Sequence, residues 1–233
     1  MLKKVSFLIL SVTLLVAYES TLGQSYATQL TEDSKLGATI HDLRVQAVIA
    51  EQSCVISRFD PIMREVGQDE GIDWRFMSAI AYSESRFIEN LKSSQGAMGI
   101  MQIRPVVARH FDVPVELIND TETNVRLAGM LLSELDSMLQ MSASTSMEDR
   151  LSIILASYNA GIGHVMDARR LARSEGANPD SWEAVRHYLV KKSDPAYYQL
   201  DIVHSGRFTG SGQTLNYVKE VMHKYKQYCA IAS

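Results

Sequence analysis

Hydrophobic residues recur with the three-to-four-residue spacing of an amphipathic α-helix along most of the chain. The pattern predicts helices over residues 38–58, 60–69, 74–89, 124–141, 148–158, 163–174, 181–189 and 214–228. The one stretch of β character, residues 197–203, lies in an interruption that contains proline and glycine, residues 194–212. We expect a loop or at most a short β-hairpin there, near the C-terminal third. The predicted fold is therefore mainly α, a compact helical domain.

The N-terminal residues have the pattern of a secretory signal peptide. Lys3 and Lys4 precede an uncharged apolar run from Val5 to Ala17, and a short polar stretch ends at Gly23. The run is shorter than the ~20 residues that a membrane-spanning helix needs, so we expect no permanent span. We predict a cleaved signal peptide over residues 1–23, a flexible segment over 24–36 and one domain over 37–233. The expected protein is soluble and periplasmic or otherwise exported, with an uncut N-terminal anchor as the alternative.

Composition and charge exclude several classes of protein. With 46% hydrophobic and 21% charged residues the 233-residue chain is typical of globular proteins, and its net charge of −4 provides no positive field for a nucleic acid. The six histidines show no paired ligand spacing, so we expect no metal and no cofactor. Export would place Cys54 and Cys229 in an oxidising compartment, where a disulfide between them is expected. Two buried thiols are the alternative.

Glu84 is the candidate for chemistry that stands out within the helix predicted over residues 74–89. At about 100° per residue, its side chain projects between those of Ile80 and Met77, inside the apolar stripe. A carboxyl group removed from water either finds a partner or acquires a higher pKa, and can then donate a proton near neutral pH. The structural alternative is a glutamate that reaches the edge of the stripe or pairs with an arginine.

The segment that follows this helix favours a chemical role. Residues 92–105 read KSSQGAMGIMQIRP, with Gly96 and Gly99 three apart among small and apolar residues. Glycines allow the backbone to approach another surface closely, and Ser93 and Gln102 are neutral hydrogen-bonding groups. Such groups beside a protonated carboxyl suit a sugar better than an anion. The alternative is a plain connection between two helices.

Four motifs follow one another along the chain: ESRF at 84–87, SSQGAMGIMQIRP at 93–105, SYNAG at 157–161 and QTLNYV at 213–218. Together, and in this order, they resemble the catalytic module of lytic transglycosylases, the goose-lysozyme-like family that cleaves bacterial peptidoglycan. Residues 71–75 and 163–172 are most similar to the membrane-bound F type. That type has a further N-terminal solute-binding-like domain, for which we expect no room in this chain. The resemblance covers residues 71–228.

The resemblance implies a lysozyme-like fold and a set of site residues. Glu84 would be the single catalytic acid and base. The substrate would be bound by Ser93, Met101, Gln102, Tyr158, Asn159 and Tyr217. Three positions depart from the family pattern: Ser157 replaces an alanine, Gln213 replaces a glutamate that forms an ion pair in relatives, and Arg104 places a cation near the cleft.

The implied reaction cleaves the β-1,4 bond between N-acetylmuramic acid and N-acetylglucosamine without water and forms a 1,6-anhydro ring. No cofactor is implied, and the partner is a peptidoglycan glycan strand. The segment 88–113 contains only Glu89 and Asp112 as carboxylates, but the fold could still bring Asp120, Glu122 or Asp180 into the cleft. One alternative is a muramidase that uses water, which the reducing ends of its products would distinguish. Another is a catalytically silent peptidoglycan-binding module of a secretion, pilus or conjugation machine.

Overall fold

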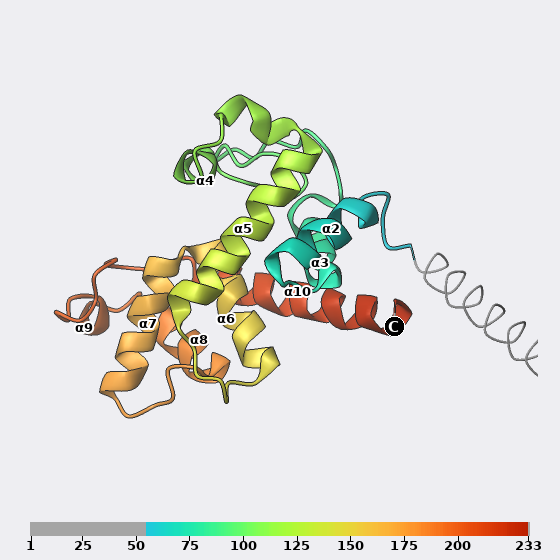
Figure 1. Ribbon diagram of the computed structural model, residues 1–233. Helices are drawn as coiled ribbons and strands as arrows, with labels where there is room; N and C mark the ends of the chain where they lie inside the picture. The colour runs from blue at the N-terminus through green and yellow to red at the C-terminus, as the bar shows by residue number, and fades with distance from the viewer. Residues whose placement is uncertain (1–54, 233) are drawn as a thin grey trace, which may run out of the picture. The chain divides into compact units, whose positions relative to one another are not determined.

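The computed structural model describes residues 55–232, and helices dominate this range (Figure 1). The α-helices are α2 (Asp60–Glu70), α3 (Trp74–Ser85), α4 (Pro105–His110), α5 (Thr121–Leu139), α6 (Met147–Ala160), α7 (Ile162–Ser174), α8 (Trp182–Lys191), α9 (Pro195–Tyr198) and α10 (Ser211–Ile231). A 3-10 helix, η1, spans Val115–Asn119. The mainly α fold predicted from the spacing of apolar residues is confirmed.

Polar side chains fix where several of the long helices begin. The carboxylates of Asp73 and Asp120 and the hydroxyl of Ser146 accept backbone N–H groups at the starts of α3, α5 and α6. Each N-cap satisfies a donor that has no partner within its helix. Because Asp120 caps α5, this helix starts at residue 121, three residues before the predicted start.

Helix α3 ends at Ser85, four residues before the predicted end at 89. Arg86 and Phe87 adopt left-handed backbone conformations, with φ of 55° and 61°, and the Arg86 amide closes the helix on the Tyr82 carbonyl. The apolar spacing of Phe87 and Ile88 continues the helical pattern, but the backbone does not. This early end leaves Glu84 in the last turn of α3.

Segments between the long helices also differ from expectation. Helices α4 and η1 lie in a region where no helix was predicted. The segment 194–212 contains the short helix α9, and residues 199–210 form the expected loop without a β-hairpin. Two isolated antiparallel β-bridges, Lys92 with Met98 and Met98 with Ile103, lie instead in the glycine-containing segment. Residues 55–58 are not helical as predicted, because the Asp60 carboxylate binds the amides of Ile56 and Ser57.

The helices pack around one hydrophobic core that includes Met77, Ile80, Leu132 and Ile153. Helix α10 packs along α3 and α6, α5 packs against α2 and α6, and α7 packs against α8. In Figure 1, α5 runs from the neighbourhood of α4 toward the group formed by α6, α7 and α8. Gly129 allows α5 to approach α2, since a Cβ atom there would lie 2.4 Å from Val66 Cγ1.

Several expectations concern residues outside the described range. They are the signal peptide over 1–23, the flexible segment over 24–36, the start of the domain at 37, most of the helix over 38–58, and Cys54. Cys229, half-buried on α10, is a free thiol in residues 55–232, and its pairing with Cys54 stays a prediction. None of the helices between residues 55 and 232 is long and apolar enough to cross a membrane.

Candidate active site

Glu84 is half-buried in the last turn of α3, beside the fully buried Ile80. Burial raises its pKa from an ordinary 4.5 to about 7, although the hydroxyl of Tyr217 lowers the pKa in part. No cation of the described residues contributes to this pKa, so the alternative of a structural pair with arginine does not apply there. A carboxyl group with this pKa is partly protonated at neutral pH, and it can both donate and accept a proton.

Glu84 opens onto a cleft of about 340 Å³. Five of the seven predicted site residues line this cleft together: Glu84, Ser93, Gln102, Tyr158 and Asn159. The other residues of its wall are Ser94, Gln95, Ala97, Ile103, Arg104, Val107, Leu131 and Gln213. The cleft therefore combines one acid, one cation and several neutral hydrogen-bonding groups.

Glu84 is the sole carboxylate among the described residues that line the cleft. The three other candidates have partners elsewhere in the fold. Asp120 caps α5, Glu122 pairs with Arg126 at 3.0 Å, and Asp180 pairs with Arg169. Within residues 55–232, the cleft thus has no second carboxylate of the kind that a two-carboxylate glycosidase uses.

Ser93 shapes the near end of the glycine-containing segment. Its hydroxyl oxygen accepts the Ala97 amide at 2.9 Å, and its own amide donates to the Ala97 carbonyl at 2.9 Å. These bonds close a tight turn in which Gly96 has a φ of 80°. Gln102 also has a positive φ, 50°, and its amide nitrogen donates to the carbonyls of Gly99 and Leu91.

Asn124 on α5 holds the far end of this segment and was not identified from the sequence. Its side-chain nitrogen donates to the carbonyls of Met98 and Ile118, and its oxygen accepts the Met101 amide at 2.8 Å. A Cβ atom at Gly99 would lie 2.4 Å from the same nitrogen. Asn124 is completely buried, so a polar residue in the first turn of an otherwise apolar helix face was the available signal.

Tyr158 on α6 connects the cleft wall to the same segment. Its hydroxyl donates to the Met101 carbonyl at 2.7 Å. Burial, together with the nearby Glu84 charge, raises the pKa of Tyr158 well above its usual value, so the hydroxyl keeps its proton. The Met101 side chain is completely buried and does not line the cleft, and Met101 contributes through its backbone.

Helix α10 brings the last predicted residue, Tyr217, to Glu84. Burial, and then the charge of Glu84, raise the pKa of Tyr217 well above its usual value. Its hydroxyl forms no hydrogen bond of normal geometry within residues 55–232. It nevertheless lies close enough to Glu84 to lower the pKa of that carboxyl group. One turn earlier, Thr214 donates to the Asn159 side-chain oxygen at 2.8 Å and fixes this residue in the cleft.

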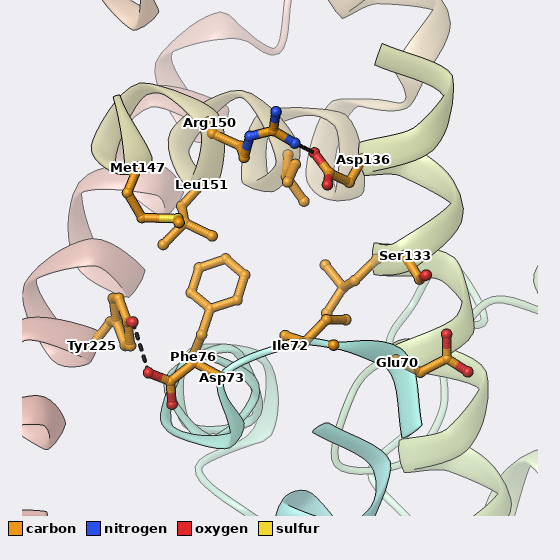
Figure 2. Close-up of a pocket in the computed structure, with 13 residues that line it drawn as sticks. Glu70, Ile72, Asp73, Phe76, Ser133, Asp136, Met147, Arg150, Leu151 and Tyr225 are labelled. Atoms are coloured by element: carbon orange, nitrogen blue, oxygen red, sulfur yellow. Dashed lines mark hydrogen bonds and ion pairs between the residues drawn. The ribbon is translucent and has the colours of Figure 1, made fainter. Parts of the chain in front are cut away.

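A second pocket, of about 480 Å³, lies between the α2–α3 turn and helices α5, α6 and α10 (Figure 2). Apolar side chains such as Phe76 and Leu151 line much of it. Of its polar groups, Asp136 pairs with Arg150, and Asp73 accepts the Tyr225 hydroxyl. None of the predicted site residues lines this pocket, so the candidate chemistry lies in the Glu84 cleft.

Comparisons with known proteins agree with the motifs. The family model described as Transglycosylase SLT domain matches residues 61–180. Membrane-bound lytic murein transglycosylase F of Vibrio cholerae is 29% identical over 215 residues, which are 91% of this chain and 39% of that protein. The protein of the same name from Shewanella pealeana is 33% identical over 156 residues, 67% of this chain and 31% of that protein.

A crystal structure of the 70 kDa soluble lytic transglycosylase from Escherichia coli aligns with a TM-score of 0.47 and 24% identity, over 80% of this chain and 27% of that chain. This chain spans less than two fifths of the length of the two relatives named above. The match to the family model covers more than half of the chain and confirms the resemblance of the motifs. This chain therefore belongs to the transglycosylase SLT domain family.

Proposed function

We propose that this protein is a peptidoglycan lytic transglycosylase. It cleaves the β-1,4 bond between N-acetylmuramic acid and N-acetylglucosamine and leaves a 1,6-anhydro-N-acetylmuramic acid end. The observation that carries the proposal is a single carboxyl group, Glu84, with a pKa of about 7, in a cleft whose described wall holds no second carboxylate. The names of the relatives, lytic murein transglycosylases, support the same reaction.

The reaction uses Glu84 twice. Protonated Glu84 donates its proton to the glycosidic oxygen as the bond to C1 breaks. With no second carboxylate among the described residues of the cleft to act as a nucleophile, the N-acetyl group of the substrate stabilises the positive charge at C1, as in substrate-assisted glycosidases. Ionised Glu84 then accepts the proton of the C6 hydroxyl, whose oxygen bonds to C1 and closes the anhydro ring. Glu84 ends the cycle protonated.

Neutral side chains hold the sugar in this proposal. The Ser93 hydroxyl accepts one backbone bond and keeps its proton for a ligand. Gln102 uses its amide nitrogen internally and keeps its oxygen, whereas Asn159 uses its oxygen and keeps its nitrogen. The cleft therefore offers both donors and acceptors, which matches the hydroxyl and acetamido groups of an amino sugar.

Arg104 offers a contact for the peptide part of the polymer. Arg104 is exposed at the cleft and can pair with the carboxylates of a peptide stem.

The apolar leader of residues 1–23 supports export to the periplasm, where the polymer lies. Fractionation of cells that express the tagged chain, with cytoplasmic and membrane markers, tests this location, and recovery with the cytoplasmic marker would contradict it.

Mass analysis of muropeptides released from purified sacculi tests the reaction. We expect the wild-type protein to release anhydro-ended muropeptides and Glu84→Gln to release at least about 100-fold less, because a proton donor is lost. Glu89→Gln is the matched control, since Glu89 pairs with Arg58 outside the cleft. Reducing ends without anhydro rings would favour a muramidase. No release by the wild-type protein, or equal release by Glu84→Gln, would contradict the proposal.

A further inference from the structure

A completely buried ion pair lies away from the Glu84 cleft. The carboxylate of Asp167 on α7 contacts the ammonium group of Lys192, directly after α8, at 2.5 Å, and both side chains have no exposed surface. Arg170 pairs with Asp167 as well, and His164 lies 3.0 Å from the Lys192 nitrogen. We call these four residues the Asp167 cluster. Removing two charges from water is costly, so a buried pair needs several further bonds to be tolerated.

The further bonds of the cluster go to the loop between α9 and α10, residues 199–210. The amides of His204 and Ser205 both donate to the Asp167 carboxylate at 2.8 Å. Arg170 donates to the Ile202 carbonyl at 2.7 Å. Burial raises the pKa of Asp167, but the bonds from Lys192 and from the two amides outweigh this effect, so its pKa lies below the usual range.

Phe208 attaches the end of the loop to the same cluster. Its amide donates to the Lys192 carbonyl at 3.1 Å, and its ring lies 4.6 Å from the His164 ring. The loop is thus held at four places between residues 202 and 208. Only residues 209 and 210 separate this anchored stretch from α10, which begins at Ser211.

The first turns of α10 form part of the active site. Gln213 lines the cleft, Thr214 binds Asn159, and Tyr217 lies beside Glu84. The position of these groups relative to the cleft therefore depends on where the loop places the start of α10. The loop, in turn, has two of its four attachments at the Asp167 carboxylate, and a third at Arg170, which pairs with Asp167.

We propose that Asp167 is a positioning residue of the active site, which places the start of α10, and with it Tyr217 and Gln213, against the Glu84 cleft. The expected effect of Asp167 on activity rests on the proposed function. Asp167 acts through the loop and α10 and does not touch the substrate.

The double variant Asp167→Asn with Lys192→Met tests the proposal. Asp167→Asn alone would leave a buried unpaired ammonium group and unfold the protein, whereas neutralising both partners is often tolerated. We expect this double variant to melt cooperatively and to release anhydro-muropeptides with a kcat/KM about tenfold lower. We also expect a carbon-13 NMR titration to give Glu84 a higher pKa, because Tyr217 no longer lowers it.

Arg169→Met with Asp180→Asn is the matched control. Arg169 lies on the same helix and forms a largely buried pair with Asp180. It holds the carbonyls of Leu139, at the end of α5, and of Pro179, and neither residue lines the cleft. We expect this control to keep the wild-type activity and Glu84 titration. Equal loss of activity in both double variants, or a wild-type Glu84 titration in the Asp167 variant, would overturn the inference. The titration needs no substrate, so it separates this outcome from a failure of the proposed function.

Discussion

Glu84 owes its raised pKa to burial, and under the proposed function this pKa makes the activity depend on pH. Only the protonated form can donate to the glycosidic oxygen, so above pH 7 the fraction of competent enzyme falls about tenfold per pH unit. We expect kcat/KM for sacculus digestion to show an alkaline limb near pH 7. In Tyr217→Phe this limb moves to higher pH, because the hydroxyl that lowers the Glu84 pKa is gone.

Tyr158→Phe is the control for this pH profile. The Tyr158 hydroxyl donates to the Met101 carbonyl and does not contribute to the Glu84 pKa. Its loss lowers the rate without moving the alkaline limb. A limb that stays in place in Tyr217→Phe would show that Tyr217 does not act on Glu84.

Glu84 also lowers the stability of the folded protein at high pH. The pKa of Glu84 is about 7 when folded and 4.5 as an ordinary glutamate, so the folded state binds the proton more tightly. The stability that this tighter proton binding contributes is present in full below pH 4.5 and is lost as the pH rises through 7. Glu84→Gln does not titrate, and its free energy of unfolding relative to wild type should rise by up to about 3 kcal/mol between pH 4 and pH 8.

Urea denaturation of both proteins at the two pH values measures this difference. The other titrating groups are shared, so their effects cancel in the comparison. A difference that does not change with pH would mean that Glu84 is not held in a desolvated state. Improved stability in an inactive variant would identify the site as one where function is maintained against stability.

At the level of elements, backbone strain gathers between the end of α3 and the glycine-containing segment. Arg86, Phe87, Asn90 and Gln102 all have positive φ without being glycine. Each such conformation costs about 1 to 2 kcal/mol relative to the right-handed region. The surrounding bonds of Ser85 and Asn124 offset this cost, since Ser85 donates to the Ile100 carbonyl at 2.8 Å. The strained backbone is what turns the chain around Glu84.

Gly96 and Gly99 provide a matched test of this segment. Both have positive φ, but a Cβ atom meets nothing within 4 Å at Gly96, whereas at Gly99 it meets the Asn124 side chain. Gly96→Ala should lower the free energy of unfolding by about 1 to 2 kcal/mol and leave the site intact. Gly99→Ala should cost more, because the Asn124 amide must move and its buried partners lose their bonds.

Urea denaturation and muropeptide release measure both effects. We expect Gly96→Ala to retain most activity and Gly99→Ala to lose most of it at a temperature where it is still folded. Equal effects in the two variants would mean that the strain matters and that contact with Asn124 does not.

For the whole molecule, apolar spacing predicted the long helices and the position of Glu84 on α3. It could not predict the end of α3, because Phe87 continues the apolar spacing while its backbone turns left-handed. Nor could spacing place Asn124 or Asp167, since their partners lie far along the chain and only the packed helices bring them together. One cleft holds four residues that the motifs named, Ser93, Gln102, Tyr158 and Asn159, whereas the Met101 side chain lies in the core. Their binding of substrate stays a prediction.

Helix α10 lies antiparallel along α3 and contacts it at both ends. Tyr217 lies beside Glu84, and toward the other end the Tyr225 hydroxyl donates to Asp73, across 152 positions of sequence. During synthesis, contacts this distant form only after α10 has emerged. In a nascent chain, Glu84 is therefore present before Tyr217 lies beside it. Under the proposed function, cutting begins only after α10 has packed against α3 and has brought Tyr217 to Glu84.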